Sequence, residues 1–262
     1  MTWCSPDAQR IEKTLRDCGA MLLDCLAAGR TEGQWSGAQF KAKADDLAHD
    51  FLATALSTTF PGVPVVSEED AASIVYCAGD HFIIDPIDGT ASFAHGFAGW
   101  VTQAAYIRNG LPVMAGIYAP ASDEYFAAIS KQGAYCNGQQ LSVTGSGERA
   151  LSIIDNYPEP CGVAQALMQE LNIPKYVESG SIALKICRVA NRNVDLFVKD
   201  MTPRDWDVAA PMLLLQEAGG VLTDIKGDAL ILGGPERRHQ GLIAAASPAV
   251  AEKVQAWFAS CK

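Results

Sequence analysis

The stretch Phe82-Ile83-Ile84-Asp85-Pro86-Ile87-Asp88-Gly89-Thr90 places two carboxylates three residues apart, directly after an apolar run. The apolar run predicts a buried strand over 81–85, and the residues that follow predict a turn. Pro86 fixes the backbone between the acids, and Gly89 permits a tight bend and the close approach of a ligand. Hard cations such as Mg2+ bind oxygen ligands of this kind. Taken alone, the stretch fits a metal site and a turn with solvated acids equally well.

Composition indicates a globular protein of 262 residues with 49% hydrophobic residues and a net charge of −10. The negative charge argues against nucleic acid as a default partner. The polar segment Met1 to Arg10 has no apolar core of a signal peptide, and no apolar run approaches the length that spans a bilayer. We therefore expect a soluble, cytoplasmic protein with no membrane partner.

The chain has eight cysteines, and none forms a Cys-x-x-Cys pair. Cys18 and Cys25 lie seven residues apart, on one face of an expected helix. Free buried thiols are the expected state, with disulfides or a zinc site as the alternatives.

Apolar periodicity predicts the elements of both halves of the chain. The first half is expected to hold helices at 7–30 and 45–58 and strands at 63–66, 81–85, 100–108, 112–119 and 123–129. The second half is expected to hold strands at 152–155, 175–178, 194–198, 221–223 and 242–245 and helices at 162–171, 181–191, 207–218 and 248–260. This alternation of strands and helices in the second half indicates an α/β layer structure.

Gly145-Ser146-Gly147 is the best linker candidate. It divides the chain into an α+β domain at 1–145, with most of the candidate metal ligands, and an α/β domain at 146–262. The second domain carries Asp207 and the residues expected to select the substrate.

Two distant segments add acids to those of the opening stretch. Ser67-Glu68-Glu69-Asp70 follows an apolar run, and Trp206-Asp207-Val208-Ala209-Ala210 opens an expected helix. Each segment taken alone is common in proteins. Asp207, for example, could simply interact favourably with the helix dipole from the first helical turn. Together, and in this order and spacing, the three segments resemble the inositol monophosphatase family of metal-dependent phosphatases. Further matches are Gly133-Ala134-Tyr135-Cys136-Asn137-Gly138, Gly180-Ser181 and Glu217-Ala218-Gly219-Gly220.

The resemblance implies a layered α/β/α/β/α sandwich, with ligands between its two halves, and two or three Mg2+ ions. It assigns one ion to Glu68, Asp85 and the carbonyl oxygen of Ile87, and a second to Asp85, Asp88 and Asp207. Cations would also relieve the repulsion among these carboxylates. The backbone N–H groups of Gly89 and Thr90 would bind the phosphoryl group.

The resemblance also pairs the Thr90 hydroxyl with Asp45, so that the two activate the attacking water, and it counts Glu68 among the catalytic residues. A helix cap is the alternative role for Asp45. The family's threonine three residues before this aspartate is replaced by Ala42, which puts a third metal position and a lid loop in doubt. Lys41 or Lys43 could supply positive charge instead, although a solvated lysine is the simpler interpretation of each.

Three further residues, Ser181, Lys185 and Asp200, are candidates for recognising the substrate. Asp200 lies seven residues before Asp207, where inositol-hydrolysing relatives hold sugar hydroxyls, and the spacing from Ser181 to Leu184 also follows that branch. Lys185 resembles the bisphosphate-nucleotidase branch, where a lysine would suit a second phosphate. Asp200 and Lys185 could each be merely exposed.

The resemblance thus implies a Mg2+-dependent phosphomonoesterase that hydrolyses a small phosphorylated polyol such as inositol monophosphate. The alternatives are a 3′(2′),5′-bisphosphate nucleotidase, a histidinol phosphatase, or a non-enzymatic regulatory binding protein on the same fold. Lithium sensitivity and a homodimer are expected from the resemblance alone.

Overall fold

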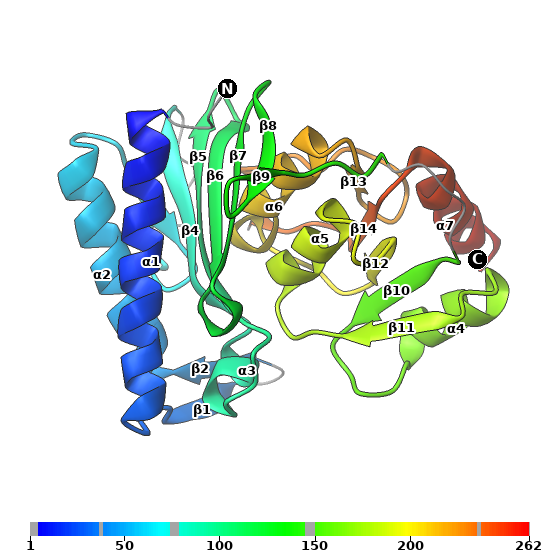
Figure 1. Ribbon diagram of the computed structural model, residues 1–262, viewed down its shortest axis with the longest axis horizontal. Coiled ribbons are helices and arrows are strands. Elements are labelled where there is room, and N and C mark those ends of the chain that lie inside the picture. Colours follow the sequence, from blue (N-terminus) through cyan, green and yellow to red (C-terminus); the bar gives the residue numbers. More distant parts are fainter. Residues whose placement is uncertain (1–4, 37–38, 74–78, 145–149, 235–236, 262) are drawn as a thin grey trace.

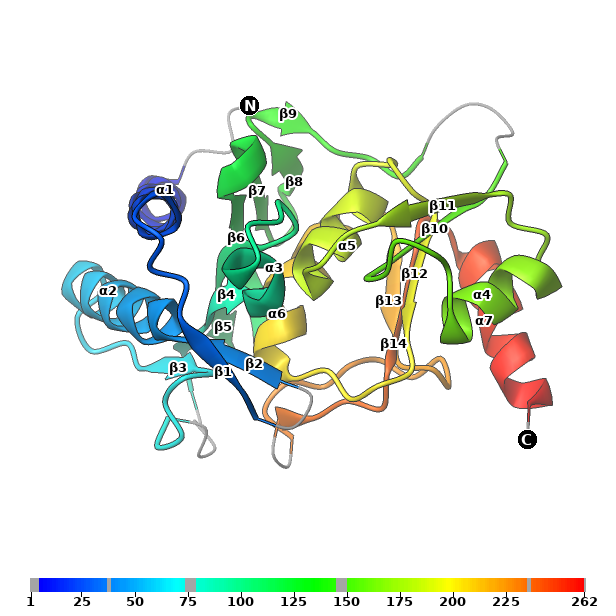
Figure 2. The same cartoon turned by 90° about the horizontal axis from the view of Figure 1, so that it is seen from below.

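The protein is described by a computed structural model that covers residues 5–36, 39–73, 79–144, 150–234 and 237–261. Its elements stack in five layers, as Figure 1 and Figure 2 show. Two long helices cover one face of a large sheet, two helices lie between this sheet and a second one, and two helices cover the outer face of the second sheet. The layered α/β/α/β/α sandwich is therefore confirmed.

The first layer consists of α1 (Pro6–Ala27) and α2 (Lys43–Thr59). The Ser5 hydroxyl caps α1 by accepting a 3.1 Å hydrogen bond from the Ala8 amide, and Pro6 occupies the first turn. Apolar side chains of α1, such as Leu15 and Leu22, are fully buried against the sheet. A two-stranded ribbon, β1 (Gly33–Ser36) and β2 (Gln39–Ala42), connects the two helices.

The large sheet has seven strands in the order β3-β4-β5-β6-β7-β8-β9. All its pairs are antiparallel except β3 with β4. Asn109 and Gly110, both with positive φ, form the predicted two-residue hairpin turn between β5 and β6. The strands are β3 (Val65–Ser67), β4 (His81–Asp88), β5 (Val101–Arg108), β6 (Leu111–Ala119), β7 (Glu124–Ile129), β8 (Gly133–Cys136) and β9 (Gln139–Gln140).

The second sheet has five strands in the order β11-β10-β12-β14-β13. Its first three strands are parallel, so their carboxyl ends meet at one edge. The strands are β10 (Ser152–Asp155), β11 (Lys175–Glu178), β12 (Leu196–Lys199), β13 (Val221–Thr223) and β14 (Leu242–Ala245). The helices on its outer face are α4 (Gly162–Glu170) and α7 (Pro248–Ser260).

The middle layer consists of α5 (Ile182–Ala190) and α6 (Asp205–Glu217). Both are buried on nearly all sides, and their side chains form one apolar core with both sheets. At the end of α6, the Glu217 carboxylate accepts hydrogen bonds of 2.7 and 2.8 Å from the amides of Lys131 and Gly133. This contact joins two of the sequence segments that match the family pattern.

The structure corrects several predicted boundaries. β4 continues to Asp88, three residues beyond the predicted strand, and α6 begins two residues earlier than predicted, at Asp205. The strand β1, which begins at Gly33, and the five-residue helix α3 (Thr90–Ala94) were not predicted. The linker at 145–147, and with it the boundary between the two predicted domains, lies outside the described residues.

Two other predictions concern thiols and membranes. Six cysteines lie in the described part of the chain; all six are free, and three of them, Cys18, Cys25 and Cys187, are buried. The helices in the described ranges include none that is both long and apolar enough to cross a membrane.

Candidate metal centre and active site

A β-bulge points Asp85 and Asp88 to the same side of β4. Residues three apart in a regular strand face opposite sides. Here Asp85 pairs with Gln103 and Asp88 pairs with Val101, so three steps along β4 match two steps along β5. The extra residue reverses the alternation between the two acids. Both carboxylates are buried and point into the space between the sheets.

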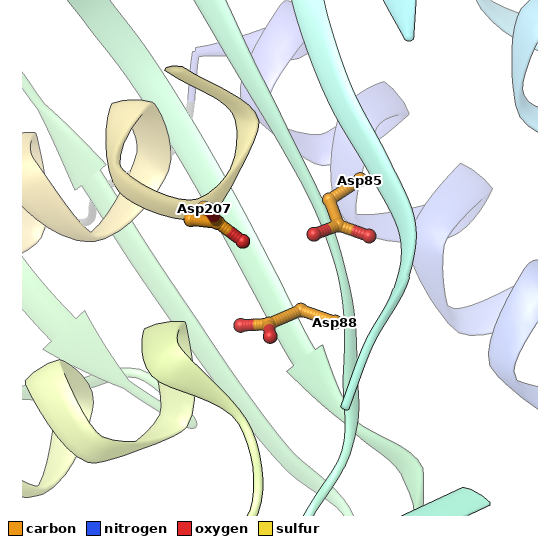
Figure 3. Close-up of side chains that lie close together, drawn as sticks. All are labelled: Asp85, Asp88 and Asp207. Atoms are coloured by element: carbon orange, nitrogen blue, oxygen red, sulfur yellow. The ribbon is translucent and has the colours of Figure 1, made fainter. Parts of the chain in front are cut away.

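Asp207 approaches this pair from the opposite side. It lies in the first turn of α6, where one carboxylate oxygen accepts a 2.6 Å hydrogen bond from the Arg204 amide. One carboxylate oxygen from each of Asp85, Asp88 and Asp207 lies within 4.8 Å of the other two. Figure 3 shows the three side chains close together. The structure therefore brings together residues that are separated by more than a hundred positions in the sequence.

Glu68 completes the acidic cluster. It follows β3, whose last residue Ser67 pairs in parallel with Ile84, so Glu68 lies beside the start of the bulge. Burial raises the pKa of Glu68 to about 8, and the charge of Asp207 contributes to the rise. Burial and the neighbouring acids also raise the pKa of Asp85, and burial raises that of Asp207 to about 7. Glu68, Asp85 and Asp207 thus favour their protonated forms unless positive charge compensates them.

The residues fit the Mg2+ that the family pattern implies. Carboxylate oxygens are ligands that this cation accepts. Asp85 Oδ1 is buried and has no hydrogen-bond partner among the described residues, which leaves it available to a cation. The carbonyl oxygen of Ile87 accepts a hydrogen bond from the Thr90 hydroxyl and retains a second lone pair.

Asp88 also fixes the N-terminus of α5. Its carboxylate accepts hydrogen bonds of 2.6 Å from the Ser181 hydroxyl, 3.2 Å from the Ile182 amide and 2.6 Å from the Ala183 amide. Ser181 is fully buried and also caps α5 by accepting from the Leu184 amide. Its hydroxyl is thus engaged with Asp88, and the direct contact with substrate suggested by the sequence stays a prediction.

Asp45 and Thr90 lie together, as the family pattern implies. The Thr90 hydroxyl oxygen is 3.2 Å from Asp45 Oδ1 and 3.0 Å from the Ile87 carbonyl oxygen, and its single proton serves one of them at a time. Asp45 Oδ2 accepts a 2.6 Å hydrogen bond from the Ala42 amide at the start of α2. Asp45 therefore combines the helix-capping role with a contact to Thr90. Burial raises its pKa to about 7.

Three glycines allow the backbone to approach the site closely. Gly89 has a φ of 95°, and a Cβ there would lie 2.7 Å from the Gly99 carbonyl oxygen. A Cβ on Gly180 would lie 2.6 Å from the same oxygen, so the loop before α5 packs directly on the loop before β5. A larger side chain at Gly180 would push the two halves apart, whereas one at Gly89 would clash with Gly99 and Trp100 of its own half.

The two lysines before α2 differ in their surroundings. The Lys41 ammonium lies 2.5 Å from Glu69 and 3.0 Å from Asp46, so it places positive charge next to the acidic cluster. The Lys43 ammonium forms an exposed ion pair with Glu32 at 2.6 Å.

A cavity of about 1190 Å3 opens between the halves, and the acidic cluster forms one of its walls. Another part of its lining comes from the carboxyl ends of the parallel strands β10, β11 and β12, where ligands of open α/β sheets bind. Sequence reasoning missed Asn156, which follows β10, and Lys199, which ends β12. Their positions directly after predicted strands were the available signal.

The cavity does not include every residue that the sequence suggested. Asp200 is exposed and is not among the lining residues, whereas its neighbour Lys199 lines the cavity. Lys185 is fully buried behind the wall. Its ammonium donates hydrogen bonds to the side-chain oxygen of Asn156 and, at 3.3 and 3.2 Å, to the carbonyl oxygens of Ser179 and Gly180. Direct contact of either residue with a substrate stays a prediction.

Comparisons with known proteins agree with this geometry. The inositol monophosphatase family model matches residues 11–260. The chain is 31% identical over 225 residues to the inositol monophosphatase of Dictyostelium discoideum, covering 81% of this chain and 82% of that protein. It is 30% identical over 237 residues to the Nus factor SuhB of Xylella fastidiosa, covering 85% of this chain and 83% of that protein. The structure of the extragenic suppressor protein SuhB from Bartonella henselae matches with a TM-score of 0.80 and 26% identity, over 96% of this chain and 97% of that one.

Proposed function

The chain belongs to the inositol monophosphatase family of metal-dependent phosphomonoesterases, and we propose that it uses Mg2+ to hydrolyse a small phosphorylated polyol. One observation carries the proposal: the carboxylates of Asp85, Asp88 and Asp207 converge within 4.8 Å beside the Asp45–Thr90 pair. This is an arrangement for binding cations and for orienting a water next to a phosphoryl group.

Glu68, Asp85 and the Ile87 carbonyl oxygen would hold one Mg2+, and Asp85, Asp88 and Asp207 a second. When bound, Mg2+ supplies positive charge that stabilises the attacking and leaving oxygens of the displacement. The three carboxylates with raised pKa values, on Glu68, Asp85 and Asp207, would ionise as the cations bind.

The protein's own groups position the phosphate and the water. The backbone N–H groups of Gly89 and Thr90, after the bulge, would donate to the phosphoryl oxygens. The Thr90 hydroxyl would orient the water, and Asp45 Oδ1, with its pKa near 7, would accept the proton through Thr90. The water oxygen forms a bond to phosphorus, the ester P–O bond breaks, and the polyol oxygen leaves with a proton from solvent.

The choice of a polyol rests on the activities that the relatives' names state, which include inositol monophosphatase and fructose-1,6-bisphosphatase. Asp200 does not line the cavity and so gives no support to inositol monophosphate in particular, while the spacing from Ser181 to Leu184 still follows the inositol branch. The large cavity and the Lys199 charge favour a second candidate, a bisphosphate nucleotidase. Histidinol phosphate stays a further option with no observation in its favour.

Measuring phosphate release tests the proposal. The purified protein should release phosphate from p-nitrophenyl phosphate and from members of a panel with added Mg2+, and should lose this activity in EDTA. The panel contains inositol 1-phosphate, fructose 1,6-bisphosphate, 3′-phosphoadenosine 5′-phosphate and histidinol phosphate. No Mg2+-dependent release from any of them would contradict the proposal and would favour the regulatory binding protein, a role consistent with the Nus factor name of one relative.

Three finer properties remain proposals, and two of them, lithium inhibition and the homodimer, rest on the family alone. We expect inhibition by lithium, a homodimer and a cytoplasmic location. Activity at increasing LiCl concentration, sedimentation of the purified protein, and fractionation of cells measure them separately.

A further inference from the structure

Lys199 brings a positive charge into the cavity beside the acidic cluster. It ends β12, is partly buried and lines the cavity. Its ammonium is close enough to Asp207 to offset part of the rise in that carboxyl's pKa. Within the described part of the chain, no carboxylate lies at ion-pair distance from it. A cation that lines a cavity without a counter-ion can pair with an anionic ligand group.

The position of Lys199 at a strand end places its charge where a ligand would lie. β10, β11 and β12 run parallel, and their carboxyl ends bring Asn156, Gly180 and Lys199 to one wall of the cavity. The acidic cluster lines the same cavity. A substrate whose scissile phosphate lies on the cluster therefore presents the remainder of its structure to Lys199.

Two charged residues near Lys199, Asp200 and Lys185, do not take this role. Asp200 is exposed and outside the cavity, so it adds no negative charge there to bind sugar hydroxyls. The buried Lys185 ammonium already donates to Asn156 and two backbone carbonyls and lies 4.7 Å from the centre of the Phe197 ring. Lys185 thus orders the wall, whereas Lys199 presents charge to the cavity.

We propose that Lys199 determines specificity by binding a second anionic group, a phosphate or carboxylate, on a phosphorylated polyol. This proposal rests on the phosphatase function proposed above and adds a class of substrate to it. The cavity of about 1190 Å3 exceeds the upper end of ordinary ligand pockets, about 1000 Å3, and so has room for such a substrate.

Matched substrate pairs test the proposal. One pair is 3′-phosphoadenosine 5′-phosphate and adenosine 3′-phosphate, and the other is fructose 1,6-bisphosphate and fructose 1-phosphate. Each pair differs by one phosphate, and the two pairs distinguish a nucleotide from a sugar. The wild-type protein should have a kcat/KM about tenfold or more higher for the bisphosphate in at least one pair.

Lys199→Met should lower kcat/KM for that bisphosphate, mainly through KM, by about tenfold to a hundredfold more than it lowers kcat/KM for the matched monophosphate. Lys199→Arg should restore most of the preference. Lys253→Met is the matched control, because it removes the same charge from an exposed position on α7. It should leave the preference unchanged.

Two results would overturn the proposal. The first is a wild-type protein that hydrolyses p-nitrophenyl phosphate with Mg2+ but prefers neither bisphosphate; this result leaves the phosphatase function standing. The second is an equal loss of kcat/KM for both substrates of a pair in Lys199→Met, which would show that Lys199 acts on the acidic cluster instead. Absence of any Mg2+-dependent hydrolysis would contradict the phosphatase function and this proposal together.

Discussion

The Ser181 hydroxyl donates a 2.6 Å hydrogen bond to Asp88 Oδ2 and at the same time caps α5 by accepting from the Leu184 amide. This one side chain connects a candidate metal ligand on the large sheet to the helix layer of the second half. The orientation of Asp88 therefore depends on the packing of two halves that are distant in sequence.

Ser181→Ala should reduce both stability and Mg2+ affinity, because it removes the cap and a hydrogen bond that orients Asp88. We expect a loss of about 0.5–2 kcal/mol in the free energy of unfolding. Ser247→Ala is the control, since Ser247 caps α7 in the same way but far from the site. Urea unfolding and Mg2+ titration of both variants measure the effects. Equal Mg2+ affinity in the two variants would refute the orienting role.

Asp45→Asn and Thr90→Ala should each lower kcat while leaving Mg2+ binding largely intact, because neither residue is proposed as a main ligand. Losing a proton acceptor costs about 10²–10⁴-fold. Since the two residues act as one unit, the double variant should be little slower than the slower single variant. Strictly multiplicative losses would leave Asp45 with only its helix-capping contact to the Ala42 amide.

The metal-free protein should lose stability as pH rises. The pKa values of Asp45 and Asp207 are raised to about 7, and that of Glu68 to about 8, whereas the unfolded chain has carboxyl pKa values near 4. Between about pH 4 and about pH 8 the folded state thus binds more protons than the unfolded chain. The contribution of these three groups to the stability of the folded state is complete below about pH 4 and disappears as pH rises through about 7 to 8. With Mg2+ present, the stability of the folded state should instead rise with pH over this range. Melting temperatures in EDTA that stay level or increase over this range would contradict the assignment.

Lys185→Met should affect all substrates alike, because the Lys185 ammonium acts through Asn156, Ser179 and Gly180. We expect KM to rise by about threefold to tenfold for mono- and bisphosphates, as the wall loses its internal hydrogen bonds. Steady-state kinetics on the matched substrate pairs measure this. A loss confined to bisphosphates would instead support the direct contact with a second phosphate suggested by the sequence.

The sequence was sufficient to predict the layered fold and the elements that carry the acids. Long periodic segments such as α1 and α7 were predicted to within a few residues, because a buried apolar face requires regular spacing. The ribbon β1–β2 was missed, because its short polar sequence has no such spacing. The end of β4 was also missed, because Pro86 and Gly89 indicate a turn while the bulge allows the strand to continue to Asp88.

The substrate side of the site was less predictable, for a physical reason. The direction of a side chain at a strand end depends on local twist and pairing, so the sequence could not show that Lys199 enters the cavity while Asp200 faces solvent. A buried lysine such as Lys185 contradicts the usual exposure of this residue type and depends on acceptors from distant loops. The bulge that unites Asp85 and Asp88 is likewise a feature of pairing with β5.

Calorimetric titration of Mg2+ into Asp207→Asn, together with phosphate release at saturating Mg2+, tests the central claim most directly. An asparagine oxygen can still accept the hydrogen bond from the Arg204 amide, so the variant should fold while it loses the ligand charge. Asp228→Asn, at an exposed position, is the matched control and should behave like the wild-type protein. We predict that Asp207→Asn binds Mg2+ more weakly and loses about a hundredfold or more in turnover, or about 2.7 kcal/mol in the barrier. Wild-type Mg2+ affinity and near-normal turnover in Asp207→Asn would contradict the account.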